Sequence, residues 1–279
     1  MQDRQAKFER FRSLHMRDRA FVIPNPWDAG SARLLSSLGF EALATTSAGY
    51  AFSVGKRDSF AALSRDEVLG NAAGIVAATE LPVSADLEDG FGASPEACAT
   101  TIELAAGTGL AGGSIEDATG DPDRPIHEMA AAVARIEAAV EAARGRSFLL
   151  TARAENYLWG RPDLRDTIAR LQAFSRAGAD VLYAPGLSDL DAIRTVCREV
   201  DKPVNVVMGL RGARYTVDQL SEAGVRRISV GGSFARVALG AVKRAAEEVL
   251  GRGTFDYAED AIPASVLHAL MSSEKRGDG

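Results

Sequence analysis

The chain has 279 residues, of which 46% are hydrophobic, and a formal net charge of −6. That apolar content is enough for one large α/β domain or for two smaller ones. The 32 basic residues are scattered rather than gathered into a nucleic-acid-binding stripe, and no apolar run reaches the 18 residues of a membrane span. The N-terminus is polar and helical in pattern, unlike a signal peptide, so we expect a soluble, cytoplasmic protein.

Short β-rich runs recur along the chain, and a helical stretch follows each of them. The runs lack the polar alternation of a half-exposed sheet, which is typical of parallel strands buried on both faces. Cys98 and Cys197 fall in the helical stretches without metal-ligand spacing, so we expect both to be small buried residues. The eight runs lie at 21–26, 41–47, 81–87, 112–117, 147–153, 181–186, 203–208 and 226–232.

Start and stop signals separate these runs from the helices. The capping-box pattern occurs at Ser64, Ser188 and Thr216, and Pro95 follows Ser94 at a first helical position. Glycines that fit a left-handed helix cap stand just before four of the strands, at Gly39, Gly109, Gly178 and Gly224.

Eight strand–helix repeats in one chain predict an α/β fold of the TIM (β/α)8 barrel type. A doubly wound sheet is the alternative, but the first turn lacks its glycine-rich sequence. We expect a barrel with an N-terminal helix over 1–250. The segment 251–279 then forms a C-terminal helical tail, whose apolar stretch SVLHALM (265–271) has little core of its own.

Acidic side chains follow two neighbouring strands of the predicted barrel. Asp86 and Glu88 alternate at the end of the third strand, and Glu116 ends the fourth. Strand ends form the functional rim of such barrels, and three oxygen ligands suit Mg²⁺ or Mn²⁺ better than zinc. The alternative is a set of solvated loop acids or helix caps.

Other polar residues fall at the same predicted rim. Arg153 ends the fifth strand and needs an anion, either Glu155 or Glu116 of the protein or the carboxylate or phosphonate of a substrate. Residues Ser47, Ala48 and Gly49 form a small-residue turn whose backbone N–H groups can receive an anion, or else a plain connection.

These positions match a known family. The chain resembles the isocitrate lyase/phosphoenolpyruvate mutase superfamily over about residues 8–250. The resemblance rests on the segments PNPWDAGSARLLSSLGFEALATTSAGY, GKRD (55–58), ADLEDGFG, GGSIED, TARAE and VRRISVGG, in that order.

The resemblance implies a Mg²⁺-dependent barrel that acts on 2-oxo acids through an enolate. It makes Asp86, Glu88 and Glu116 the acids on the metal side. It also gives Ser47 and the small residues after it, together with Arg153, to the substrate's anionic groups. Asp58 matches a functional acid of the mutase branch, and Asn205 lies at a strand end that approaches the substrate in the lyases.

The loop after the fourth strand departs from the family. The lyases carry a Lys-Cys-Gly-His motif there, and the mutases carry a Lys-Thr or Lys-Asn pattern. Here the loop reads DATGDPDRPIHEM, with Asp121 and Arg124 in place of those motifs. We therefore do not expect isocitrate or methylisocitrate cleavage by the usual chemistry. Arg124, steered by Asp121 or His127, becomes the candidate contact for a departing carboxylate.

Together these features predict a Mg²⁺-dependent lyase or decarboxylase that cleaves a C–C bond of a small 2-oxo or 2-hydroxy diacid through a metal-stabilised enolate. Decarboxylation needs no base for bond breaking, whereas a retro-aldol cleavage does, with Tyr50, Glu155 or Asp58 as candidates. The alternatives are C–P bond chemistry on phosphonopyruvate and a non-catalytic 2-oxo acid binder. The positions of Lys202 and Lys56 argue against a Schiff-base aldolase.

The C-terminal segment bears on assembly. A short apolar helix without a core is only marginally stable alone. Members of the family also commonly exchange a C-terminal helix between barrels. We therefore expect a homo-oligomer, a tetramer built as a dimer of dimers, with the helix docked on a neighbouring subunit.

Overall fold

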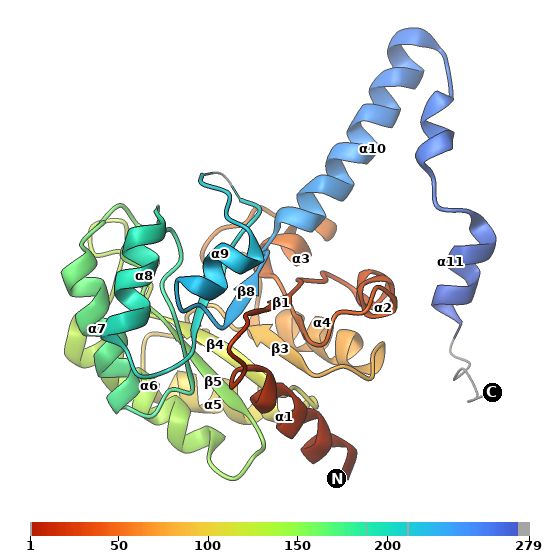
Figure 1. Cartoon of the computed structure of the whole chain (residues 1–279). Helices are drawn as coiled ribbons and strands as arrows, with labels where there is room; N and C mark the ends of the chain where they lie inside the picture. Colours follow the sequence, from red (N-terminus) through yellow and green to blue (C-terminus); the bar gives the residue numbers. More distant parts are fainter. Residues whose placement is uncertain (1, 188, 211, 273–279) are drawn as a thin grey trace.

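The fold is an eight-stranded parallel barrel, in a computed structural model that describes residues 2–187, 189–210 and 212–272 (Figure 1). From β2 to β8 each strand pairs with its sequence neighbour, and β1 pairs with β8, in the order β1-β8-β7-β6-β5-β4-β3-β2. Between β1 and β2 the barrel is nearly closed, with a hydrogen bond from the Ala44 N–H to the Pro24 carbonyl (3.0 Å). The TIM-barrel prediction is confirmed.

All eight strands fall inside the predicted runs. They are β1 (Phe21–Ile23), β2 (Leu43–Ala44), β3 (Val83–Asp86), β4 (Gly112–Glu116), β5 (Leu149–Arg153), β6 (Val181–Tyr183), β7 (Val204–Val207) and β8 (Arg227–Ser229). The helices are α1 (Gln2–Leu14), α2 (Ala29–Ser37), α3 (Ser47–Ser53), α4 (Arg65–Ala77), α5 (Pro95–Gly107), α6 (Met129–Ala143), α7 (Leu164–Arg176), α8 (Leu190–Glu199), α9 (Val217–Glu222), α10 (Ser233–Arg252) and α11 (Ala264–Met271), with a 3₁₀ turn η1 (Asp256–Asp260).

The helix signals are largely confirmed. Ser64 and Thr216 form capping boxes at α4 and α9, and Pro95 begins α5. Ser188 lies outside the described residues, and at α8 the Asp189 side chain accepts from the Ala192 N–H. The four glycines before strands all have φ between +88° and +105°.

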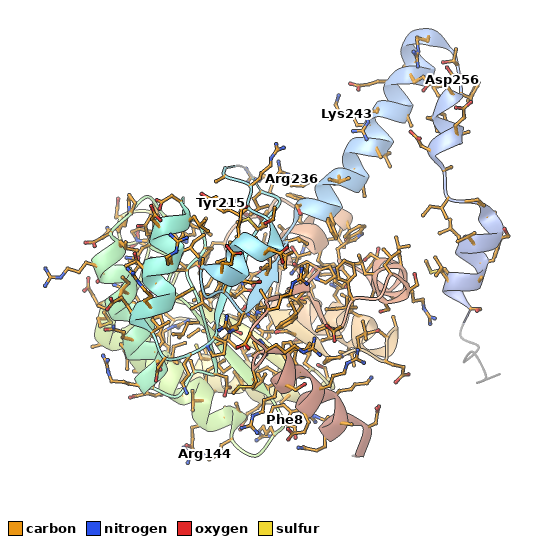
Figure 2. The ribbon with its side chains drawn as sticks, in the orientation of Figure 1. Phe8, Arg144, Tyr215, Arg236, Lys243 and Asp256 are labelled. Atoms are coloured by element: carbon orange, nitrogen blue, oxygen red, sulfur yellow. The ribbon has the colours of Figure 1, made fainter. Side chains whose placement is uncertain are left out.

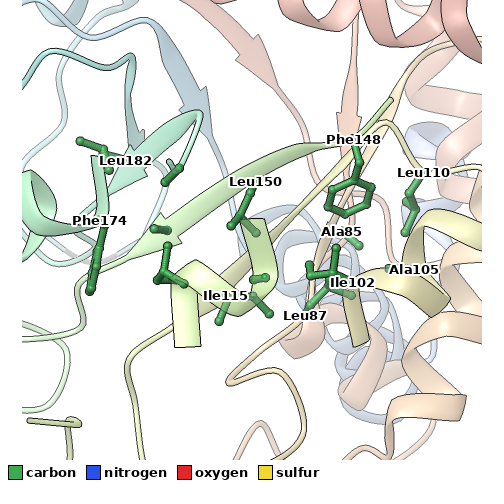
Figure 3. Close-up of a cluster of buried hydrophobic side chains, with 14 of the residues drawn as sticks. Ala85, Leu87, Ile102, Ala105, Leu110, Ile115, Phe148, Leu150, Phe174 and Leu182 are labelled. Carbon is green, nitrogen blue, oxygen red and sulfur yellow. The ribbon is translucent and has the colours of Figure 1, made fainter. Parts of the chain in front are cut away.

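The main core lies between the strands and the surrounding helices (Figure 3). Ile102 and Ala105 of α5 are fully buried there, beside Leu87 and Ile115 from the strand side. The close packing of these apolar side chains fixes α5 against β3 and β4. The predicted burial of Cys98 is confirmed, whereas Cys197 is only half-buried.

A second, smaller core closes the end of the barrel where the strands begin. Phe11 and Leu14 of α1 are fully buried against Phe21 and Leu149. His15 packs edge-on between the rings of Phe11 and Phe21, at 4.8 and 5.0 Å between centroids. Burial, and then the charge of Arg227, lower the pKa of His15 to about 3, so the imidazole is neutral. The predicted N-terminal helix is thus the plug of the barrel floor.

The chain after β8 leaves the barrel. Helix α10 projects outward, with Lys243 on its outer part, and η1 and α11 run back alongside it (Figures 1 and 2). The end of α11 meets α2, where Arg33 donates to the Ser272 carbonyl (3.1 Å). Val237, Val242 and Leu250 of α10 remain 66–87% exposed. In the part of the chain that is described, no helix is both long and apolar enough to cross a membrane.

We predict that Phe11→Ala lowers the free energy of unfolding by about 3–5 kcal/mol, because truncation leaves a cavity in the barrel floor. The matched control is Phe255→Ala, since that ring is 65% exposed. Chemical denaturation of both variants measures the difference. Equal losses in the two variants would show that α1 is dispensable to the fold.

Candidate active site

One arginine binds three acids at the rim where the strands end. The guanidinium of Arg153 pairs with Asp86 through Nη1 (3.0 Å), with Glu116 through Nη2 (2.9 Å) and with Glu155 through Nε (2.8 Å). The strand register explains the meeting, because Glu116 of β4 lies directly opposite Arg153 of β5. The predicted pairing of Arg153 with Glu155 or Glu116 is confirmed for both acids; its contact with a substrate stays a prediction.

The charges at this site do not balance. Three carboxylates surround one buried guanidinium, which also lies over the Tyr183 ring at 5.2 Å. Burial alone would lower the pKa of Arg153, but the carboxylates of Glu155, Glu116 and Asp86 raise it well above its usual range. Burial raises the pKa of Glu116 and of Glu155, against the opposing charge of Arg153.

Ser47 positions Asp86 within this group. Both its N–H (3.3 Å) and its hydroxyl (2.8 Å) donate to Asp86 Oδ2. The predicted turn at Ser47, Ala48 and Gly49 is in fact the first turn of α3, which Thr46 caps by accepting from the Gly49 N–H (3.2 Å). The small residues allow close packing, since a Cβ on Gly49 would lie 3.2 Å from Ala235 of α10.

Glu88 and Asp58 add two further acids beside the group. The Glu88 backbone is left-handed (φ 49°), and its carbonyl accepts from the Glu116 N–H (3.0 Å). Burial, and then repulsion by Asp86, Asp89 and Asp58, raise the pKa of Glu88 to about 8. Asp58 is exposed as a whole, yet lost solvation at its carboxyl and repulsion by Asp86 raise its pKa.

The third acid of the ADLEDG segment, Asp89, has a different role. Asp89 is buried, and its side chain accepts from the Phe91 N–H (3.0 Å). Arg135 of α6 donates to the carbonyls of Asp89 and Gly92 and fixes this loop from below. Asp89 is thus used for the turn, and Asp86 and Glu88 are left to face the rim.

The donor set at the rim is made of carboxylate oxygens, which suits Mg²⁺ or Mn²⁺. Asp86, Glu88 and Glu116 repel one another electrostatically, so a cation placed among them would be stabilised. Within residues 2–187, 189–210 and 212–272, no group of three or more His, Cys, Asp or Glu side chains is arranged as a ready metal site. Instead, the Arg153 guanidinium lies between Asp86 and Glu116.

The remaining predicted residues, Tyr50, Asn205 and Arg124, have their bonds and contacts elsewhere than the Arg153 group. Tyr50 of α3 packs partly against the hydrophobic core. Asn205 is buried inside the barrel, where its amide donates to Ser229 Oγ (3.1 Å) and accepts from Arg227 Nε (2.9 Å). Arg124 is on the 118–127 loop, with a side chain that is 82% exposed and pairs with Asp121 (3.4 Å).

Both ends of the 118–127 loop are anchored. Arg170 of α7 donates to Asp117 Oδ2 (2.9 Å) and to the His127 carbonyl (2.8 Å). Asp117 in turn accepts from the Glu155 N–H (2.8 Å), which links the loop base to the acid that holds Arg153. Near its tip, Gly120 (φ 75°) lies against the Phe60 ring, from the segment between α3 and α4.

Sequence reasoning did not single out two residues that shape the site. Asn25 joins three strand ends: its amide donates to the Thr45 carbonyl (2.8 Å) and accepts from the Val230 and Gly231 N–H groups (both 2.9 Å). Arg227 extends beneath the rim, inside the barrel. The only signal for either is a polar residue within or just after a run that is otherwise buried.

Comparisons with known proteins relate the chain to lyases and mutases. A family model described as "Phosphoenolpyruvate phosphomutase" matches residues 11–250. A solved structure from Burkholderia cenocepacia J2315, for which a lyase or mutase activity has been suggested, is 57% identical, with a TM-score of 0.94 and 96% of each chain covered. The structure of a 2,3-dimethylmalate lyase is 28% identical, with a TM-score of 0.84 and 95% and 94% coverage. Oxaloacetate decarboxylase of Pseudomonas fluorescens is 27% identical over 271 residues, covering 95% of this chain and 91% of its own.

The raised pKa of Glu88 yields a prediction about pH. The unfolded carboxyl titrates near 4.5 and the folded one near 8, so between these values the folded chain holds more protons. In EDTA, the stability contributed by protonated Glu88 is present below pH 4.5 and is lost as the pH rises through 8. Urea unfolding at several pH values should show a smaller decline for Glu88→Gln than for the exposed control Glu80→Gln. Identical pH profiles for the wild type and Glu88→Gln would contradict the assignment.

Proposed function

The chain belongs to the phosphoenolpyruvate phosphomutase family, and from this premise we propose that it is a divalent-metal-dependent lyase. The relatives support an enzyme of the lyase or mutase type that acts on a small molecule. The reaction we propose is cleavage of a carbon–carbon bond in a small 2-oxo diacid. Decarboxylation is its simplest form.

The observation that carries this proposal is the excess of acids at the rim. Three carboxylates meet one guanidinium, and Glu88 approaches the same group. A structural ion pair needs one acid for each base, and surplus buried carboxylates are costly unless they are protonated or meet a cation. Asp86, Glu88 and Glu116 would hold the metal ion. When bound, such an ion supplies Lewis-acid stabilisation of negative charge on substrate oxygens.

The protein groups around the acids then have separable roles. Ser47 holds Asp86 in one orientation through two hydrogen bonds. Glu155, itself fixed through Asp117, orients the Arg153 guanidinium toward the rim. On arrival of a cation, Arg153 can exchange an acid partner for a substrate carboxylate, for which its planar fork is suited.

Bond cleavage leaves an enolate that must gain a proton. Asp58 is the rim acid best placed to exchange protons with solvent, since it is exposed and has a raised pKa. Glu155 is 1% exposed and engaged by Arg153, and Tyr50 packs on the core. Both are therefore less suited than Asp58 to take up a proton from solvent and pass it to the enolate. Arg124 on the neighbouring loop remains the candidate contact for a carboxylate that leaves toward solvent.

The name of the matched family favours a second candidate, C–P bond chemistry on phosphonopyruvate. The same acids and Arg153 would serve it. The 118–127 loop lacks the Lys-Thr or Lys-Asn pattern expected for that branch, which makes this the second choice. A binder without turnover is the third.

We predict that Asp86→Ala loses Mg²⁺ binding and activity together while the fold survives. Calorimetric titration with Mg²⁺ and NMR assays with oxaloacetate, phosphonopyruvate and methylisocitrate, each with and without EDTA, measure both properties. Glu80→Ala is the control, because Glu80 is exposed and precedes β3, at the end of the barrel opposite the acids. Unchanged Mg²⁺ affinity in Asp86→Ala would remove the metal assignment. If the wild type turns over none of these substrates, the non-catalytic binder is the remaining hypothesis.

We also propose that the protein is a homo-oligomer, with tetramer as the expected size, assembled through α10 and α11. The exposed apolar side chains of both helices support this, including Leu250 (87%), Val266 (45%) and Met271 (43%). Exposed apolar surface of this kind marks an interaction site.

We predict that truncation after Leu250 breaks up the oligomer, so that light scattering gives a mass close to that of one subunit. A charged substitution, Val242→Glu, should have the same effect without removing any residue. Val242 is 67% exposed, so the new charge does not lower the stability of the folded subunit. Asp256→Ala serves as the control on the same arm. A full-length monomer at micromolar concentration would contradict the proposal.

A further inference from the structure

A second buried arginine lies inside the barrel, beneath the rim. Arg227, the first residue of β8, is 5% exposed. Its Nε donates to Asn205 Oδ1 (2.9 Å) and its Nη2 to Thr151 Oγ1 (3.0 Å). Its Nη1 is buried and has no hydrogen-bond partner among the described residues.

The environment of Arg227 differs from that of the other buried arginines. Arg153 and Arg170 pair with carboxylates, and Arg135 is held by two backbone carbonyls. Across the described part of the chain, Arg227 forms no ion pair, and both of its partners are neutral side-chain oxygens. A buried charge without a counter-ion is costly.

Arg227 is nevertheless charged at neutral pH. Burial lowers the pKa of its guanidinium to about 10, with the nearby Tyr183 opposing the shift, and 10 is still well above 7. His15, whose pKa the charge of Arg227 helps to lower, is neutral. The barrel interior therefore carries a net positive charge at this level.

Arg227 is one of the residues that line a cavity of about 70 Å³, which also reaches Asp86 and Arg153 at the rim. Hydroxyl groups from three strands line the same cavity, at Ser84, Ser114 and Ser229, and they can donate to an anion. Asp86 also faces it, but that carboxylate is already engaged by Ser47 and Arg153. The space is large enough for a few water molecules or one carboxylate group.

We propose that Arg227 is the centre of a second anion site, which binds one carboxylate-sized anion inside the barrel through Nη1 and the cavity hydroxyls. The anion comes either from the distal carboxylate of a diacid bound at the rim or from a free small anion. Both sources present the same chemistry to the guanidinium.

The first experiment measures formate binding to the metal-free protein in EDTA, at constant ionic strength, by calorimetry and by the thermal midpoint. Binding to the folded state alone raises the midpoint with formate concentration. We expect this rise in the wild type and in Arg226→Gln, and at least a tenfold weaker affinity in Arg227→Met. Arg226 is the matched control because it is adjacent and donates to backbone carbonyls outside the barrel. Equal formate affinity in the wild type and Arg227→Met would overturn the site.

A second measurement remains decisive if Arg227→Met fails to fold. Wild-type crystals soaked in bromide should show an anomalous peak within hydrogen-bonding distance of Nη1. A cavity that contains only water in this experiment would also overturn the proposal.

The two sources are distinguished with Mg²⁺ present. If the distal carboxylate of the substrate uses the site, formate competes with a 2-oxo diacid but not with pyruvate. If a free anion uses it, formate binds together with both. This arm rests on the proposed function, whereas the metal-free arm does not, so failure of turnover and failure of the anion site remain distinguishable.

Discussion

The ion pairs of Arg153 are the interaction on which the rest of the site depends. A guanidinium has only five N–H donors in a fixed plane, and here three carboxylates from different positions share them. Removing Arg153 would leave Glu116 and Glu155 buried without a counter-charge, which is far more costly than losing a surface pair. The carboxylates also repel one another, because the acids outnumber the base. In the function proposed above, a metal ion would offset this excess of acids.

The paired strands β3, β4 and β5 bring these acids together, whereas closure of the barrel depends on few contacts. β2 has two residues and is joined to the β1 side by one backbone hydrogen bond at Pro24. The amide of Asn25 compensates at the rim, because it bonds to the ends of β2 and β8 at once. At the opposite end, α1 fills the barrel with Phe11 and Leu14. The two ends therefore have different chemistry: an apolar plug where the strands begin, and a charged rim where they end.

The sequence alone was sufficient for the barrel, because eight buried parallel strands read as apolar runs that are hard to confuse with half-exposed sheet. It also located Asp86, Glu116, Arg153 and Glu155 at strand ends, and the structure brings these four into contact. It could not decide which anion Arg153 binds, since that depends on the register of β4 against β5. Nor could it distinguish the helix that begins at Ser47 from a turn, because small residues suit both. Arg227 and Asn25 were overlooked for a similar reason: a polar residue in a buried strand has a meaning only when its partners are known.

The two interior arginines divide the barrel into levels of opposite charge. At the rim, acids outnumber Arg153, and burial raises the pKa of Glu88, Glu116 and Glu155, so a cation placed there would favour their ionised forms. One level below, Arg227 has only neutral partners and a neutral His15 beneath it, so the local charge is positive and favours an anion. Residues of both levels, Arg153 and Arg227, line a single cavity. A monoacid needs only the upper level, whereas a diacid can satisfy both at once. Under the proposed function, this arrangement would let the barrel select a diacid without any residue of the exposed 118–127 loop.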